Sequence, residues 1–319
     1  MLIAIIVLLV LILSVLVAAY VTFFLCFYST KKQKANFADP TSPLVGDEYT
    51  DFNPKVMAAV ERVLKLPFEE VRVTSHDGLK LHGKYFHNGD GLPLEIFFHG
   101  YRSAGLRDGS GAVELAPKAG FILLVVDQRG AGLSEGSVIS FGVLEKEDAK
   151  VWIDYAINRF GKEVQIILAG VSMGAATVLM ASSQNLPENV RAITADCPYS
   201  SQSEIIAKVC GDIKIPARLA MPFIRLGARL YGHFDLSSET PEEAVAKTTI
   251  PIFFVHGDAD GFVPCEMSQR MHEKCASKKA MYLAPDSPHG VSFVAHYPEY
   301  VEHLKGFFEE AGLELGWKG

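Results

Sequence analysis

The motif Gly-x-Ser-x-Gly at residues 170–174 constrains the fold of this chain more than any other stretch. Residues 164–169 before it are apolar and partly β-branched, which predicts a buried parallel strand. Residues 175–183 after it are rich in Ala, Met and Leu, which favours a helix. A serine on a sharp turn between a strand and a helix needs small neighbours, and the two glycines provide them. Such a turn exposes the Ser172 hydroxyl and directs the N–H of Met173 and the positive end of the helix toward an approaching molecule.

Length and charge set the broad class of protein. The chain has 319 residues, enough for one large domain with strands and helices around a buried core. Its net charge is −7, and no basic patch typical of nucleic-acid binding is present, so no nucleic-acid partner is predicted. The five cysteines are scattered, which indicates neither a zinc site nor a disulfide framework and fits a reducing compartment.

The N-terminal residues have a different character. Residues 2–28 carry no charge and are almost entirely apolar, long enough to span a bilayer core of about 30 Å. A cleavable signal peptide is the main alternative, but the start lacks a basic region and the apolar run continues past the small residues at 18–19. The residues before Cys26 are too bulky for a lipoprotein cleavage site. We therefore expect a retained single-pass anchor over residues 1–30.

The charges beside this anchor predict its orientation. Lys31, Lys32 and Lys34 follow the apolar run directly, whereas only the amino terminus precedes it. Because basic residues favour the cytoplasmic side of a membrane, the C-terminal domain is expected in the cytoplasm.

The remaining chain alternates between strands and helices. Residues 31–66 are interpreted as a linker, polar over 36–53, followed by a short amphipathic helix over 55–66. A hairpin over 70–86 then leads into alternating strands and helices, which predicts a mostly parallel, doubly wound sheet. Reactive loops of such sheets follow the C-terminal ends of the strands. Later strands are expected at 94–98, 121–126, 164–169, 190–195, 250–255 and 280–283, and helices at 111–118, 146–160, 175–183, 264–272 and 297–311.

One stretch interrupts this alternation. Residues 199–247 are rich in Ile, Leu, Met and Phe and contain three prolines. We interpret them as a helical insertion that covers the sheet as a cap. The apolar residues at 221–226 either pack the cap onto the domain or contact an apolar substrate, and the sequence leaves both open.

Five motifs each follow a predicted strand. They are His99-Gly100, Asp127-x-Arg129-Gly130-x-Gly132-x-Ser134, the motif at 170–174, His256-Gly257-x-x-Asp260-x-x-Val263-Pro264 and His289-Gly290. With these motifs, the chain from Glu70 onward resembles the α/β-hydrolases, and within them the membrane-anchored BEM46-like and serine aminopeptidase-like (S33-type) bacterial hydrolases. The resemblance implies an α/β-hydrolase domain over residues 67–319.

The serine of the central motif needs a base. Ser172 is a weak nucleophile at neutral pH unless a base lies within hydrogen-bonding reach. The resemblance points to His289, in the loop after the last strand, as this base. His296 and His303 lie in or beside the terminal helix and are interpreted as surface residues.

A carboxylate is expected to orient the base. The resemblance places it at Asp260, while Asp258 and Asp196 remain alternatives. The resemblance also makes His99 and His256 structural residues that hold loops.

The histidines near the hairpin have a simpler interpretation. His76, His82 and His87 are expected to be solvated strand or turn residues. Their spacing supports no metal site.

An oxyanion in the reaction requires two hydrogen-bond donors. Following the resemblance, we expect these to be the backbone N–H groups of Tyr101 and Met173. Arg102, beside this loop, is interpreted as an ordinary exposed arginine, and Arg129 as a residue that shapes its loop. Cys197 follows a strand near the site but is not needed as a nucleophile.

These features predict a serine hydrolase that cleaves an ester, thioester or amide through an acyl-enzyme intermediate. No metal or organic cofactor is implied. The anchor and the apolar cap favour an acyl or lipid-like substrate near the membrane. A peptidase acting on short peptides, acyl transfer to an acceptor other than water, and a non-catalytic scaffold with the same fold are the alternatives. The sequence does not indicate the oligomeric state.

Overall fold

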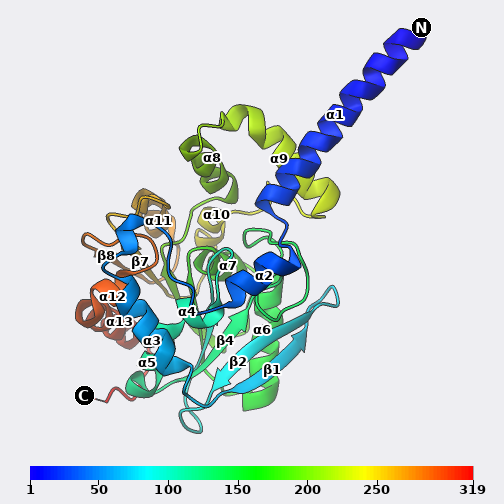
Figure 1. Cartoon of the computed structure of the whole chain (residues 1–319). Helices are drawn as coiled ribbons and strands as arrows, with labels where there is room; N and C mark the ends of the chain where they lie inside the picture. The colour runs from blue at the N-terminus through cyan, green and yellow to red at the C-terminus, as the bar shows by residue number, and fades with distance from the viewer. Residues whose placement is uncertain (319) are drawn as a thin grey trace.

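Short apolar runs along the chain form one twisted sheet at the centre of the protein. The structure, a computed structural model, describes residues 1–318 (Figure 1). Its sheet has eight strands in the order β1-β2-β4-β3-β5-β6-β7-β8. β2 pairs antiparallel with β1 and β4 and the other pairs are parallel, which confirms the hairpin entry and the mostly parallel sheet. The strands are β1 Glu69–Thr74, β2 Lys80–Phe86, β3 Leu94–Phe98, β4 Ile122–Asp127, β5 Ile166–Val171, β6 Val190–Asp196, β7 Ile252–Gly257 and β8 Lys279–Ala284.

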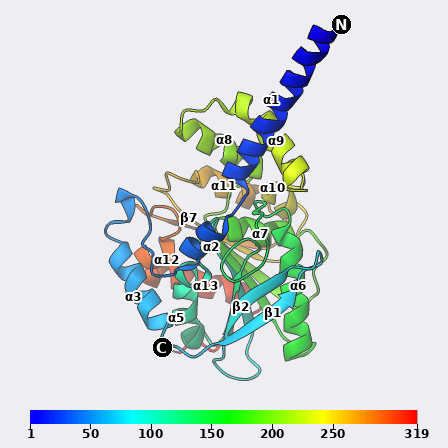
Figure 2. The ribbon, with the colours of Figure 1, turned by 45° about the vertical axis from the view of Figure 1, so that its right-hand side comes forward.

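Helices cover both faces of this sheet, which confirms the doubly wound arrangement. Buried side chains of α6, α7 and α11 pack on one face, and those of α3, α5 and α13 pack on the other. Figures 1 and 2 show α6 on one side of the sheet and α3, α5 and α13 on the opposite side. The helices are α1 Leu2–Cys26, α2 Lys31–Ala38, the 3-10 helix η1 Asp47–Tyr49, α3 Asn53–Val63, α4 Gly105–Asp108, α5 Ser110–Ala119, α6 Glu145–Phe160, α7 Met173–Ala181, α8 Gln202–Asp212, α9 Ala217–Tyr231, α10 Pro241–Val245, α11 Cys265–Lys274, α12 Ser292–Ala295 and α13 Tyr297–Glu310.

The polar stretch over 36–53 differs from the linker that the sequence predicts. It contains the end of α2 and the short helix η1, and the side chain of Tyr49 is buried. The amphipathic helix that follows is α3, and its apolar face is buried as expected. The helix ends at Val63, before the expected residue 66, and Leu64 after it is exposed.

A group of buried ion pairs holds the loop that follows β4. Arg129 donates hydrogen bonds to Asp148 at 2.7 Å and to Asp77 at 2.9 Å, in keeping with its expected role in shaping the loop. His82 was expected to be solvated, but it is only 1% exposed and its Nδ1 is 2.9 Å from Asp127 Oδ2. Burial favours the neutral carboxyl, but the hydrogen bond from His82 and nearby charges outweigh this and hold the pKa of Asp127 below its ordinary value.

The stretch over 199–247 forms α8, α9 and α10, so the expected helical cap is confirmed. Its apolar residues share a buried cluster with Met173, the residue that follows the central serine. Met221 and Ile224 pack into this cluster, whereas Phe223 and Leu226 are only half-buried and lie outside it. Of these residues, Met221 and Ile224 therefore pack the cap onto the domain.

Helix α1 is long and apolar enough to cross a membrane, judged by its length and composition. It projects away from the domain in Figure 1, and residues 2–17 are exposed. Its C-terminal end is different, because Ala19 and Phe23 are buried against the cap and Phe27 is completely buried between Phe141 and Phe234. The last turns of α1 are therefore part of the domain core.

Candidate active site

Ser172 lies on a tight turn between β5 and α7, as the sequence predicts. Its φ of 54° and ψ of −116° lie outside the helical and extended regions. A Cβ atom on Gly174 would lie 2.0 Å from the carbonyl oxygen of Phe98, and one on Gly170 would lie 2.4 Å from the Gly174 backbone. Both positions therefore require glycine, which confirms the steric reason given for the motif.

Three side chains named in the sequence analysis form a hydrogen-bonded row. His289, in the loop after β8, places its Nε2 atom 2.9 Å from Ser172 Oγ. Its Nδ1 atom lies 2.6 Å from Asp260 Oδ2, in the loop after β7. A carboxylate only accepts hydrogen bonds, so Nδ1 carries the proton and Nε2 is left to accept the proton of the serine hydroxyl. This is the geometry in which a carboxylate orients a histidine base beside a serine.

Both oxygens of the Asp260 carboxylate have hydrogen-bond partners. Its Oδ1 atom accepts the backbone N–H groups of Phe262 and Val263, both at 2.8 Å. Its Oδ2 atom lies 3.1 Å from His256 Nε2, in addition to its contact with His289. Burial by itself raises the pKa of Asp260, but hydrogen bonds and charges from the two histidines outweigh burial and hold this pKa well below its usual range. The carboxylate therefore stays ionised at neutral pH.

The other histidines agree with their expected structural roles. His256 is buried, and its Nδ1 atom lies 2.7 Å from Ser268 Oγ while its Nε2 contacts two acceptors and so carries the proton. His99 bridges two loops through backbone groups at 2.7 and 3.0 Å. His296 contacts a backbone carbonyl, and the exposed His303 stacks on a tyrosine ring, both away from Ser172.

The alternative acids lie elsewhere. Asp258 is exposed and accepts the backbone N–H of Asp286 at 2.7 Å. Asp196 lies at the end of β6, where burial raises its pKa to about 6. Within residues 1–318, Asp260 is the carboxylate that is hydrogen-bonded to His289.

The loop after β3 lies against the same cleft. The backbone N–H groups expected as oxyanion donors belong to Tyr101 in this loop and to Met173, the first residue of α7. Asp108 of α4 fixes the loop, because its carboxylate accepts the N–H of Gly100 at 2.9 Å and the hydroxyl of Ser103 at 2.5 Å. The sequence analysis missed Asp108, since nothing in its local pattern shows that α4 turns back onto this loop.

The end of α1 is hydrogen-bonded to the same loop. The Tyr101 hydroxyl donates to the carbonyl of Cys26 at 2.8 Å. Arg102 donates to the carbonyls of Leu25 and Tyr28, both at 3.0 Å. The carbonyls of Leu25 and Cys26 belong to the last turn of α1, which has no intrahelical donors for them. The sequence predicted an ordinary exposed arginine, but Arg102 instead satisfies carbonyls at and just beyond the end of α1.

A cleft of about 290 Å³ opens beside Ser172 and His289. One wall comes from the segment that was expected to be a linker, through Leu44, Val45, Glu48 and Tyr49. The Tyr49 hydroxyl donates to the backbone carbonyl of His289 at 3.1 Å. Sequence reasoning missed this wall, because the polar composition of the segment gives no sign that it returns to the site.

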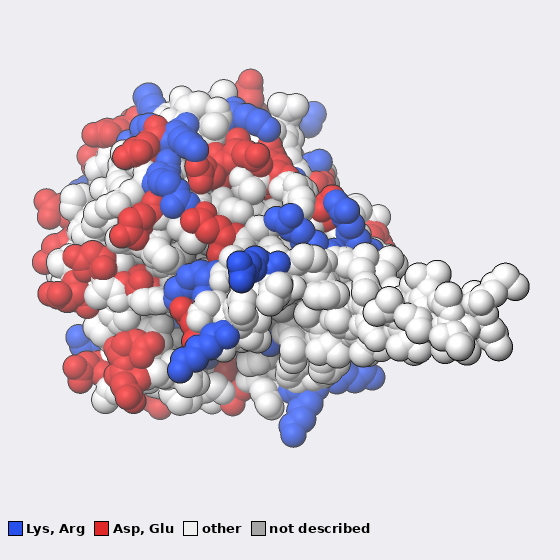
Figure 3. All heavy atoms as spheres, turned by 90° about the horizontal axis from the view of Figure 1, so that it is seen from above, with Lys and Arg blue, Asp and Glu red and all other residues white. Residues whose placement is uncertain are grey.

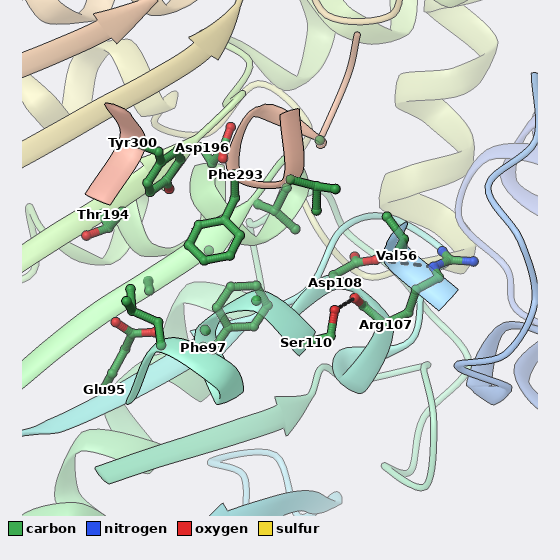
Figure 4. A pocket seen from close by; sticks show the side chains of 18 of the residues that line it. Val56, Glu95, Phe97, Arg107, Asp108, Ser110, Thr194, Asp196, Phe293 and Tyr300 are labelled. Carbon is green, nitrogen blue, oxygen red and sulfur yellow. Dashed lines mark hydrogen bonds and ion pairs between the residues drawn. The ribbon is translucent and has the colours of Figure 1, made fainter. Parts of the chain in front are cut away.

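A second cavity of about 100 Å³ lies next to this cleft and shares Leu44, Arg107, Asp108, Val171 and Gly290 with it. Figure 4 shows Phe97 and Phe293 in its middle, with polar side chains on either side. Burial raises the pKa of Glu95 in this cavity to about 8, so its carboxyl is mostly neutral at pH 7. The polar residues that Figure 4 labels are Glu95, Thr194, Asp196 and Tyr300 on one side and Arg107, Asp108 and Ser110 on the other.

Two groups of side chains have the spacing of metal ligands, and both have other partners. Cys197 Sγ lies 3.9 Å from His289 Nε2, and burial raises the pKa of this thiol well above its ordinary value. The carboxylate and imidazole beside it are already hydrogen-bonded to each other. In the second group both carboxylates accept hydrogen bonds from Arg129. The groups are Cys197, Asp260 and His289, and His76, Asp77 and Asp148.

Comparisons with known proteins identify the fold. A family model described as the alpha/beta hydrolase fold matches residues 96–209. YqkD of Bacillus subtilis is 26% identical over 191 residues, which span 60% of this chain and 63% of YqkD. YfhR of Escherichia coli K12 is 25% identical over 250 residues, which span 76% of this chain and 81% of YfhR.

Solved structures share the same architecture. The esterase Pf2001 of Pyrococcus furiosus superposes with a TM-score of 0.64 and 21% identity, covering 87% of this chain and 97% of the esterase. Est1E of Butyrivibrio proteoclasticus, solved with ferulic acid bound, gives a TM-score of 0.58 with 20% identity, over 76% of this chain and all of Est1E. An acylaminoacyl peptidase of Pyrococcus horikoshii gives 0.58 with 17% identity, over 81% of this chain and 44% of the peptidase.

The buried Glu95 makes stability depend on pH in a defined direction. Between its ordinary pKa of 4.5 and its folded pKa of about 8, the unfolded chain releases a proton that the folded chain keeps. The contribution of Glu95 to the free energy of unfolding therefore falls as pH rises, by at most about 1.4 kcal/mol per pH unit. We expect Glu95→Gln to raise Tm relative to wild type, by an amount that grows from pH 5 to pH 8.

Thermal unfolding of the full chain in detergent measures this effect. Glu302→Gln, at an exposed position of α13, is the control and should track the wild type at every pH. A Glu95→Gln difference that stays constant with pH would show that this carboxyl does not titrate as stated.

Proposed function

Because the chain has the α/β-hydrolase fold, we propose that it is a serine hydrolase whose nucleophile, base and acid are Ser172, His289 and Asp260. The observation that carries this proposal is the row of hydrogen bonds at 2.9 and 2.6 Å that ends on a serine at a strained turn. A nucleophile, a base in contact with it and a group that orients the base are the parts that acyl transfer requires.

The first half of the reaction forms an acyl-enzyme. Ser172 Oγ attacks the carbonyl carbon of an ester, thioester or amide, and its proton moves to His289 Nε2. The carbonyl electron pair moves onto the oxygen, and in this proposal the backbone N–H groups of Tyr101 and Met173 stabilise it. When the oxyanion collapses, the leaving group departs with the proton from Nε2. Asp260 remains ionised and stabilises the imidazolium.

The second half releases the acyl group. Water attacks the acyl carbon, gives one proton to His289 Nε2 and forms a second oxyanion at the same site. Collapse of this oxyanion breaks the bond to Ser172 Oγ, which takes the proton back. The products are a carboxylic acid and the free serine, so the enzyme returns to its starting state.

The surroundings favour an acyl or lipid-like substrate. The cleft is walled by apolar groups such as Leu44, Val45 and Phe262, and the adjoining cavity has Phe97 and Phe293 at its centre. Apolar pockets with a few polar groups are typical of small-molecule sites. We therefore place the acyl group of the substrate in the cleft and the cavity next to it, close to the membrane that α1 enters.

Helix α1 is proposed to be a retained membrane anchor. Its last turns contribute Phe23 and Phe27 to the buried cluster, so cleavage within them would remove part of the domain core. Lys31, Lys32 and Lys34 after it favour a cytoplasmic domain. Protease added to sealed right-side-out vesicles, which enclose the cytoplasmic side, should leave the domain intact and should degrade it only after the vesicles are opened. Digestion in the sealed vesicles would show that the domain lies on the opposite side of the membrane.

Replacing the proposed nucleophile and its partners tests the mechanism. We expect Ser172→Ala to abolish fluorophosphonate labelling of the full chain, and Ser172→Ala and His289→Ala to lower turnover of p-nitrophenyl esters by about 10⁴- to 10⁶-fold. Asp260→Asn should cost about 10⁴-fold, because the imidazole loses the carboxylate that orients it.

Asp258→Asn is the control for the acid, since this carboxylate is exposed in a neighbouring turn. It should retain turnover within about twofold, given its distance from the reacting atoms. If the wild type is folded but neither labels nor turns over any ester, the chain is a non-catalytic scaffold. A series of ester chain lengths on the wild type measures how much acyl chain the site accepts.

The hydrogen bond between Tyr101 and the end of α1 is proposed to position the oxyanion loop. Tyr101→Phe keeps the backbone N–H and removes only the hydroxyl that reaches Cys26. A hydrogen bond of this kind contributes about 1 kcal/mol, so we expect kcat to fall about fivefold with little change in KM for a short ester.

Tyr28→Phe is the control, because the Tyr28 ring stacks on Phe24 at the same helix end. Its kinetics should match those of the wild type. Equal kcat values for Tyr101→Phe and the wild type would mean that α1 does not influence the loop.

A further inference from the structure

Helix α9 carries two apolar faces, and the domain covers only one of them. Ile224, Gly227 and Ala228 are buried against the domain and α1. A second row recurs at intervals of four, three and four residues, so its members share one side of the helix. This row, which we call the outer stripe, consists of Leu219, Phe223, Leu226 and Leu230.

The outer stripe has no cover within the described chain. Leu219 is 61% exposed and Leu230 is 44% exposed, and the two residues between them are half-buried. Two more exposed apolar side chains, Ile213 and Ile215, lie in the turn that joins α8 to α9. An exposed apolar patch of this extent marks an interaction site more often than a plain surface.

The position of α9 along α1 indicates what covers the stripe. Figures 1 and 2 show α9 crossing α1 near the point where α1 leaves the domain. At the crossing, a Cβ on Gly227 would lie 2.3 Å from the carbonyl oxygen of Ala19, so the two helices touch closely. The Tyr231 ring meets Tyr20 edge-on at 5.3 Å. The outer stripe therefore lies at the level of residues 19–20 of α1.

If α1 spans a bilayer, the bilayer surface lies at or beyond residues 19–20 of α1. Residues 2–17 rise about 24 Å at about 1.5 Å per residue, which is less than a hydrocarbon core of about 30 Å. Tyr20, Val21, Phe24 and Leu25, in the last two turns of α1, are also exposed. Apolar surface thus continues along α1 to the crossing point, and a tilt of α1 would only draw the domain closer to the bilayer.

Basic side chains flank the stripe on the next side of α9. Arg218, Arg225 and Arg229 are exposed and recur at intervals of seven and four residues, so they share one side of the helix. Arg229 pairs with Asp235 at 2.7 Å, which leaves two arginines and the exposed Lys214 near the stripe. Figure 3, seen from above, shows uncharged atoms along α1 and basic side chains around its base. An apolar row beside a basic row is the pattern of a helix that lies in the surface of an anionic membrane.

We propose that the outer stripe of α9 is a membrane-binding surface, seated at the boundary between headgroups and acyl chains of an anionic bilayer. This inference rests on the proposed role of α1 as a retained anchor. It adds a second attachment, through the cap, that holds the domain against the membrane. The cap shares a buried cluster with Met173, the residue after Ser172, so this attachment holds the active site close to the bilayer surface.

Tryptophan fluorescence in vesicles with brominated lipids tests the proposal. Leu219→Trp of the full chain is reconstituted in phosphatidylcholine–phosphatidylglycerol vesicles whose acyl chains carry bromine near the headgroup. We expect at least a twofold loss of the added fluorescence relative to vesicles without bromine. The wild type, which contains Trp152 and Trp317, supplies the background to subtract.

Two further variants make the result decisive. Leu66→Trp, at a site 42% exposed beyond α3, should keep its fluorescence, and Val10→Trp should be quenched by bromine deep in the acyl chains. Quenching at Val10→Trp but not at Leu219→Trp would overturn the cap proposal and leave the anchor in place. Quenching at neither would overturn both. Ester turnover by the same vesicles reports the proposed hydrolase activity separately, and it should be unchanged by these substitutions.

Discussion

The close approach of the turn between β5 and α7 to strand β3 is the constraint on which the site depends. A Cβ on Gly174 would meet the carbonyl oxygen of Phe98 at 2.0 Å, so any other residue would push α7 away from the sheet. That approach holds Ser172 at a positive φ and keeps its hydroxyl at the end of the strand. Once the serine is fixed, the loops after β7 and β8 have only to bring Asp260 and His289 to it, and both loops begin at the same edge of a parallel sheet.

Helix α1 links the exposed apolar N-terminal residues to the candidate site. Its last turn is buried with the cap and is hydrogen-bonded to Tyr101 and Arg102, in the loop that faces the serine. The sequence predicted an anchor separate from the domain, but in the structure the end of α1 is part of the domain core. Cutting the chain at residue 30 would therefore expose Phe141 and Phe234 and remove the hydrogen-bond partners of Tyr101 and Arg102.

Sequence patterns predicted the elements that have strong local signals. Apolar runs bounded by glycines predicted the strands, and the motif at 170–174 predicted the turn together with its steric reason. Errors fell on residues whose environment comes from distant parts of the chain. From the sequence, His82 was predicted to be a solvated strand residue, but in the structure it contacts Asp127. Tyr49 was predicted to lie in a linker, but its hydroxyl donates a hydrogen bond to the backbone carbonyl of His289.

The sequence alone determined a mostly parallel, doubly wound sheet, because alternating apolar strands and helices can bury their faces in few ways. Its motifs added the resemblance to the α/β-hydrolases. It also singled out the serine, the histidine and three possible acids. Which of these acids contacts His289 needed the tertiary structure, since Asp258 and Asp260 follow one strand and Asp196 ends another, and only distance separates them. The structure likewise decided that α9 buries one apolar face and leaves the other bare. A sequence gives the apolar residues of a helix, but which of them are covered depends on neighbours that the fold brings from elsewhere in the chain.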